Sequence, residues 1–150
     1  MNKITIHIDK AQVWDEVAKT ASYTGDKMIG DETAYERIML TDEDAKMLQR
    51  FWEEVVSIAN DQLKEMLLGS SEVADDYKVE LEVSRAYDLN LTQSVVASLR
   101  SYFISAIVSK WYMFANKGEA ETYATEATAM LLDAVRKLYS RKRPQRPIRN

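Results

Sequence analysis

The stretch from Val95 to Ala115 constrains the fold more than any other part of the chain, because both of its sides carry side chains that pack. Apolar side chains recur along it at helical spacing: Val95, Leu99, Tyr102, Phe103, Ile107, Trp111 and Phe114. A helix that is apolar around most of its circumference is buried among other elements. We therefore predict a central helix from about residue 92 to residue 116.

A helix of this length and composition could also cross a bilayer. Arg100 and Lys110 argue against that alternative, since a basic group near the middle of a span costs about 2.5–3.5 kcal/mol on insertion scales. The N-terminus MNKITIHIDK lacks the continuous apolar core of a secretory signal. The absence of cysteine fits a reducing compartment, so we expect the protein in the cytoplasm.

Small hydroxyl residues form a stripe on the same helix: Ser94, Ser98, Ser101, Ser105 and Ser109. We interpret this stripe as a site of close helix packing, with hydroxyls that bond back to their own helix carbonyls. A polar pore or a functional site is the alternative.

Two segments alternate with the period of a half-buried strand, residues 3–8 with Ile4, Ile6 and Ile8, and residues 77–85 with Tyr77 and Val79. A two-stranded sheet is marginal alone, so it must lie on helices or pair with a neighbouring subunit. Its exposed edge is then a candidate assembly surface.

The rest of the chain is predicted to be helical. One helix follows Asp9, a plausible N-cap, and ends near Gly25; residues 34–40 add a short turn. A long helix starts at Thr41 to Asp44 and stops at Gly69, and another runs from about residue 119 to residue 140. The sequence thus predicts a mainly α fold, a bundle of about four helices with a minor two-stranded β element, as one domain over residues 1–140.

Residues 141–150 are predicted to be an extended or disordered basic tail, since Pro144 and Pro147 prevent a helix. The first 135 residues hold 13 basic and all 24 acidic side chains, a net charge of −11, whereas the last 15 carry +7. The candidate partner-binding residues are the basic ones of the tail: Arg141, Lys142, Arg143, Arg146 and Arg149.

Several interpretations of the tail remain open. It is a docking arm for an acidic surface, such as the body of another copy, or a nucleic-acid arm with a salt slope of up to about −4.5 for five phosphate contacts. A disordered terminus is the third alternative. The spacing Arg141-x-x-Pro144-x-x-Pro147 also matches a short pattern that binds aromatic grooves.

Known catalytic templates do not fit this sequence. The spacing of Gly25 and Gly30 resembles a phosphate-binding loop, but Asp31 and Glu32 stand where Lys and Ser/Thr are needed. A lone histidine, His7, excludes multi-histidine metal sites and is expected to face solvent. Acidic clusters occur at residues 42–44, 53–54 and 75–76, and we interpret the first as capping and the last as a turn. We predict that the protein is not an enzyme and that it has no cofactor and no metal site. A carboxylate-based hydrolase is the remaining alternative.

The segment RSYFISAIVSKWYMFANKGEAETYATEATAMLLDAVRKLYSRKRPQRP combines an aromatic-rich helix, a break at Gly118, a Tyr- and Ala-rich helix and an Arg-Pro tail. Over about residues 92–147 it resembles small helical structural proteins of tailed bacteriophages and prophages, of the head-completion or head-to-tail connector kind. The first ninety residues match nothing of that family.

The resemblance implies rings formed through helical bodies, with termini that reach a neighbouring ring. It implies a non-enzymatic assembly protein whose partners are its own copies and other phage structural proteins, in the host cytoplasm or on the virion. No membrane and no small-molecule substrate is expected. The alternative is a nucleic-acid-associated regulatory or packaging protein that contacts DNA through the tail.

Overall fold

The structure, a computed structural model, describes residues 1–27, 42–72, 75–113 and 117–142. The predicted short helix at 34–40, the start at Thr41 and the residues Asp31 and Glu32 lie outside these ranges. The elements in chain order are β1 (Asn2–Ile8), α1 (Lys10–Lys27), α3 (Asp42–Leu63), β2 (Leu67–Ser70), β3 (Tyr77–Val83), a 3-10 turn η1 (Leu89–Leu91), α4 (Thr92–Tyr112) and α5 (Lys117–Tyr139). The predicted mainly helical fold class is confirmed.

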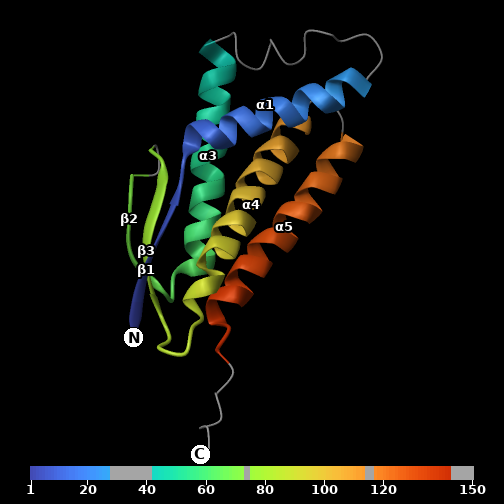
Figure 1. The fold of residues 1–150 in the computed structure, drawn as a ribbon. Helices are drawn as coiled ribbons and strands as arrows, with labels where there is room; N and C mark the ends of the chain where they lie inside the picture. Colours follow the sequence, from blue (N-terminus) through green and yellow to red (C-terminus); the bar gives the residue numbers. More distant parts are fainter. Residues whose placement is uncertain (28–41, 73–74, 114–116, 143–150) are drawn as a thin grey trace, which may run out of the picture.

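Helix α4 lies at the centre of the fold (Figure 1). It packs along α5 on one side, and it also contacts α1, α3 and β1. Helix α1 crosses the bundle near the end where α5 begins, and the sheet lies on the side of α4 away from α5 (Figure 1). Ten residues of α4 are buried, so the central position predicted for this helix is confirmed.

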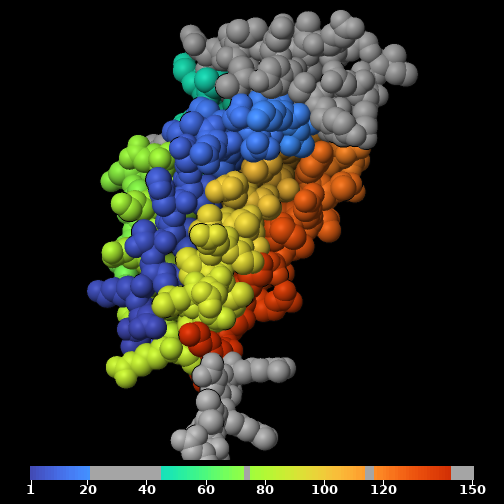
Figure 2. Space-filling model, viewed as in Figure 1, coloured from blue at the N-terminus to red at the C-terminus, as the bar shows by residue number. Residues whose placement is uncertain are grey.

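Helix α4 together with η1, Leu89–Tyr112, is long and apolar enough to cross a membrane by length and composition. Within the fold it packs as a core helix, as predicted, because Phe103, Ile107 and Val108 are fully buried among the neighbouring elements. Figure 2 shows that α4 still reaches the surface between β1 and α5 on one face of the molecule.

The sheet has the order β1-β3-β2 and is antiparallel throughout. Its two long strands pair in register from Asn2 opposite Val83 to Ile8 opposite Tyr77. The alternating apolar residues of both strands face the helices and are buried, as their period of two predicts. The two predicted strands therefore pair with each other within one chain.

The third strand, β2, was not predicted. It has four residues, an irregular register between Leu67 and Gly69, and side chains that are mostly exposed. A short edge strand of this kind carries no alternating apolar signal, and its Gly69 and Ser70 are typical of a helix stop. The helix before it ends at Leu63, a few residues earlier than the sequence indicated.

An aromatic cluster joins the sheet to the helices. Phe103 of α4 lies between three rings, with centroid distances of 5.1 Å to Trp52, 5.0 Å to Tyr77 and 5.2 Å to Tyr102. The polar atoms of these rings are bonded: Tyr102 donates to the Val55 carbonyl at 2.8 Å, and Tyr77 to the side chain of Asn60 at 2.9 Å. Burial raises the pKa of both tyrosines, so both hydroxyls stay protonated.

Candidate functional site

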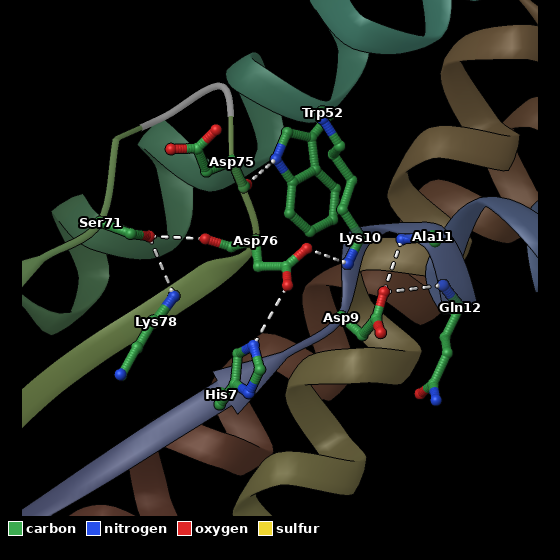
Figure 3. A network of polar contacts seen from close by, with 10 residues as sticks. All are labelled: His7, Asp9, Lys10, Ala11, Gln12, Trp52, Ser71, Asp75, Asp76 and Lys78. Atoms are coloured by element: carbon green, nitrogen blue, oxygen red, sulfur yellow. Dashed lines mark hydrogen bonds and ion pairs between the residues drawn. The ribbon is translucent and has the colours of Figure 1, made fainter.

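The lone histidine lies in a polar network where β1, the start of α1 and the turn before β3 meet (Figure 3). His7 Nε2 lies 3.3 Å from Asp76 Oδ2, and the Lys10 backbone N–H donates to Asp76 Oδ1 at 3.0 Å. The Lys10 amide first, and His7 second, hold the pKa of Asp76 below its usual value. The His7 side chain is 55% exposed, in agreement with the predicted solvent-facing position.

The same network fixes the start of α1 and the turn before β3. Asp9 accepts from the backbone N–H groups of Ala11 and Gln12 at 2.8 and 3.3 Å, so the predicted N-cap is confirmed. The Ser71 hydroxyl donates to the Asp76 carbonyl at 2.5 Å and accepts from Lys78 N–H at 3.1 Å. Because this hydroxyl proton points to a backbone carbonyl, the pair of His7 and Asp76 lacks the serine contact of a hydrolytic triad.

We expect Asp76→Ala to lower the free energy of unfolding by about 1 kcal/mol, because the Lys10 amide and His7 lose their acceptor at a partly exposed site. Urea denaturation at pH 7 measures this loss. Asp75→Ala is the matched control, since Asp75 contributes its backbone carbonyl to Trp52 Nε1 and the substitution keeps that bond. Equal losses in the two variants would contradict the role given to the Asp76 carboxylate.

A second polar cluster joins α4 to α5 through the serine stripe. It consists of Ser94, Ser98, Asp133 and Lys137, and we call it the clasp. Lys137 Nζ lies 2.7 Å from Asp133 Oδ2, 2.7 Å from the Ser94 hydroxyl and 3.0 Å from the Ser98 hydroxyl. Ser98 also donates to Asp133 at 2.8 Å, and Arg136 lies 2.6 Å from the second oxygen of this carboxylate. An ammonium group has three N–H donors, so the acceptors around Lys137 engage all of them. A serine beside a lysine is thus present, and this lysine is held in an ion pair with Asp133.

The serine stripe is a packing site, as we interpreted it, but its predicted hydrogen bonds are wrong for Ser98 and Ser109. Ser98 bonds to Asp133, and the Ser109 hydroxyl donates to the Ala120 carbonyl at 2.8 Å, so both reach across to α5. Small side chains let the two helices approach closely enough for these bonds. The sequence could not indicate them, because they depend on which helix packs against α4.

The clasp is expected to make the free energy of unfolding depend on pH below about pH 4. Lys137, then Ser98, lower the pKa of Asp133 from 3.8 to about 2. The stability from the ionised carboxylate is therefore present above about pH 4 and is lost as the pH falls to 2. We expect Asp133→Asn to cost about 1–2 kcal/mol at pH 7 and progressively less between pH 4 and pH 2, measured by urea denaturation. Glu126→Gln, at an exposed position of the same helix, is the control, and a loss independent of pH would contradict the assignment.

The chain forms an exposed cationic end where α5 stops. Among the predicted partner-binding residues, Arg141 and Lys142 lie within the described part of the chain, and both are exposed. Lys142 N–H donates to the Ala86 carbonyl at 2.6 Å, which ties the start of the tail to the segment after β3. The other three, Arg143, Arg146 and Arg149, lie outside the described residues.

Sequence reasoning missed Arg85 as a member of this end. It is exposed and adjacent to Ala86, so the hydrogen bond from Lys142 brings it to the start of the tail. We refer to Arg85, Arg141 and Lys142 as the cationic end. Nothing in the sequence signalled this, because Arg141 lies 56 positions after Arg85 in the sequence and only the fold brings them together.

An apolar groove of about 420 Å³ lies between α3, α4 and α5. Its lining includes Val55, Tyr102, Ala106, Ala127 and Leu131. Three large apolar side chains of the same lining are strongly exposed, with 46% of Ile58, 62% of Met113 and 56% of Leu132 accessible. Exposed apolar side chains gathered around one depression are typical of a protein-binding surface.

No group of three or more acidic or histidine side chains is positioned to hold a metal ion in the part of the chain that the structure describes. Comparisons of the chain with protein-family models, with curated proteins and with solved structures found no match. The surfaces described above are therefore the basis for a functional proposal.

Proposed function

We propose that the chain is a non-enzymatic structural subunit of the connector or adaptor kind, from a phage or prophage particle. It self-associates through its helical body and docks through its basic C-terminal residues. Its place of action is then the host cytoplasm during assembly and the particle afterwards. The resemblance of residues 92–147 to head-completion and connector proteins supports the class of protein.

The observation that carries the proposal is the cationic end on an otherwise acidic chain. Arg85, Arg141 and Lys142 are exposed at the end of α5, and the first 135 residues have a net charge of −11. Opposite charges on different surfaces of one protomer attract a second copy, or an acidic partner, in a defined orientation. The apolar groove supports the same proposal, because a stable protein–protein interface buries apolar surface in addition to its charged contacts.

Light scattering across protein concentration tests the proposal. We expect the mass to rise above the 17.2 kDa of one chain as the concentration increases. A mass that stays at one chain over the whole accessible range would contradict self-association. Negative-stain microscopy of the concentrated protein then distinguishes defined assemblies from irregular aggregates.

The alternative is a nucleic-acid-associated protein, and the specific observation in its favour is again the cationic end. Phosphate contacts by this end and the tail would give binding that weakens steeply with salt. The acidic body opposes such binding everywhere else on the surface. A titration with duplex and single-stranded DNA at low salt separates the two functions. An adaptor is expected to self-associate without binding DNA strongly enough to displace its own copies.

A further inference from the structure

One face of α5 is exposed from end to end. Its residues are spaced by three or four and all are exposed: Gly118, Glu121, Thr125, Thr128, Leu132, Arg136 and Tyr139. At about 100° per residue these positions form one stripe along the helix, which we call the α5 stripe. Leu132 and Tyr139, 56% and 57% exposed, are among the most exposed large apolar side chains of the described residues. Isolated apolar residues on a surface are ordinary, but these two share a stripe that borders the groove.

The two threonines of the stripe have their hydroxyls bonded within α5 itself. Thr125 donates its hydroxyl to the Glu121 carbonyl at 3.0 Å, and Thr128 to the Ala124 carbonyl at 3.1 Å. A hydroxyl that is already bonded within its own helix can be covered by a partner without losing a hydrogen bond. The middle of the stripe is therefore suited to burial, although threonine is a polar residue.

The stripe is complementary to itself when a second copy runs antiparallel to it. One register places Glu121 opposite Arg136 of the second copy. In the same register Thr125 lies opposite Leu132 and Gly118 lies opposite Tyr139. Thr128 then lies opposite Ala129, which is also exposed. Each large side chain then meets a small one, and each acid meets a base. The same pairing occurs twice, because a two-fold axis relates the two copies.

The charges along α5 favour the same orientation. Its first half carries Lys117 and the acids Glu119, Glu121 and Glu126, a net charge of −2, and its second half carries Asp133, Arg136 and Lys137, a net charge of +1. A parallel arrangement would place like charges together, and an antiparallel one places the acidic half of each helix beside the basic end of the other. Arg136 contacts Asp133 through one nitrogen, and its guanidinium has further N–H donors for the Glu121 carboxylate of a second copy.

The groove extends the contact beyond the stripe. Leu132 and Thr128 belong to both, and the groove continues from them to Met113 of α4 and Ile58 of α3. A helix that packs on the stripe at an interaxial distance of about 8–10 Å also covers part of this apolar lining. The flexible Met113 side chain adapts readily to such a neighbour.

We propose that the α5 stripe and the groove beside it are the surface through which two copies of this chain associate, with their α5 helices antiparallel. The proposal rests on the self-association stated under the proposed function and identifies its surface. The contact is isologous and closes as a pair, so the cationic end of each copy remains available for the acidic body of a further copy or for another acidic partner.

Disulfide trapping tests the orientation directly, because the natural chain contains no cysteine. Thr128 lies next to the proposed two-fold axis, so Thr128→Cys is expected to form a disulfide-linked dimer in high yield under mild oxidation. Glu126→Cys is the matched control, since it is exposed on the same helix but points about 160° away from Thr128. Equal yields from the two variants would overturn the proposal.

A charge exchange provides the second test. Glu121→Arg and Arg136→Glu are each expected to raise the dissociation constant of the dimer about tenfold, and the double variant is expected to recover most of the loss. Leu132→Asp is expected to abolish the dimer while the circular dichroism spectrum and thermal unfolding stay unchanged. A chain that self-associates with the affinity of the natural protein despite Leu132→Asp overturns this surface and leaves the proposed function standing. A natural chain that stays monomeric overturns both.

Discussion

Phe103→Ala is expected to lower the free energy of unfolding by about 3–5 kcal/mol, the usual cost of removing a fully buried aromatic ring. The ring contacts Trp52 of α3, Tyr77 of β3 and Tyr102 of α4, so it links three separate elements of the core. Its loss leaves a cavity that these large rings cannot collapse to fill. Since domains of this size have about 5–15 kcal/mol of stability in total, the variant is expected to be partly unfolded at physiological temperature.

Urea denaturation followed by circular dichroism measures this effect. Leu89→Ala is the control, because Leu89 is a large apolar residue but more than half exposed and lies outside the α5 stripe and the groove, and its loss is expected to cost about 0.5 kcal/mol or less. A cost below about 1 kcal/mol for Phe103→Ala would mean that the aromatic cluster does not hold the sheet to the helices.

Neutralising the basic tail is expected to have the second large effect. Substitution of Arg141, Lys142, Arg143, Arg146 and Arg149 with glutamine removes five positive charges, and we expect the affinity for the docking partner to fall about a hundredfold at low salt. The reason is that these residues supply five of the seven positive charges of the last 15 residues, whereas the first 135 residues have a net charge of −11. Sedimentation velocity, or a binding titration with the partner, measures the change.

The control for the tail variant removes the same kind of charge from the body. Lys3, Lys46 and Lys64 are exposed lysines far from one another in sequence, and their substitution with glutamine makes the body still more acidic. We expect this variant to bind as well as the natural chain or slightly better. Similar losses in both variants would mean that total charge, and not its location in the tail, sets the affinity.

The sequence predicted the regular elements well, because their signals are local. Ile4, Ile6 and Ile8 alternate, Asp9 caps α1, and the periodic apolar residues of α4 and α5 form the buried faces that the structure contains. Each of these depends on residues within a few positions of one another. Strand β2 was missed because its residues are exposed on a sheet edge, where no burial imposes a pattern.

The candidate surfaces were predicted only in part. Arg141 and Lys142 stood out by composition, but Arg85 joins them through the bond between Lys142 and Ala86, which no local pattern encodes. The clasp at Asp133 and the groove around Ile58, Met113 and Leu132 arise from the way helices far apart in sequence pack together. The α5 stripe was present in the sequence, but the exposed side chains that define it are recognised only once the buried face of the helix is known.

The central claim is that segregated charge brings copies of this chain together, and the salt dependence of self-association tests it most directly. The dissociation constant measured by sedimentation is expected to rise about tenfold or more when the ionic strength increases from about 0.05 M to 0.5 M, because the screening length falls to about 4 Å. A dissociation constant that stays unchanged or decreases with salt, as an entirely apolar contact would give, contradicts the account.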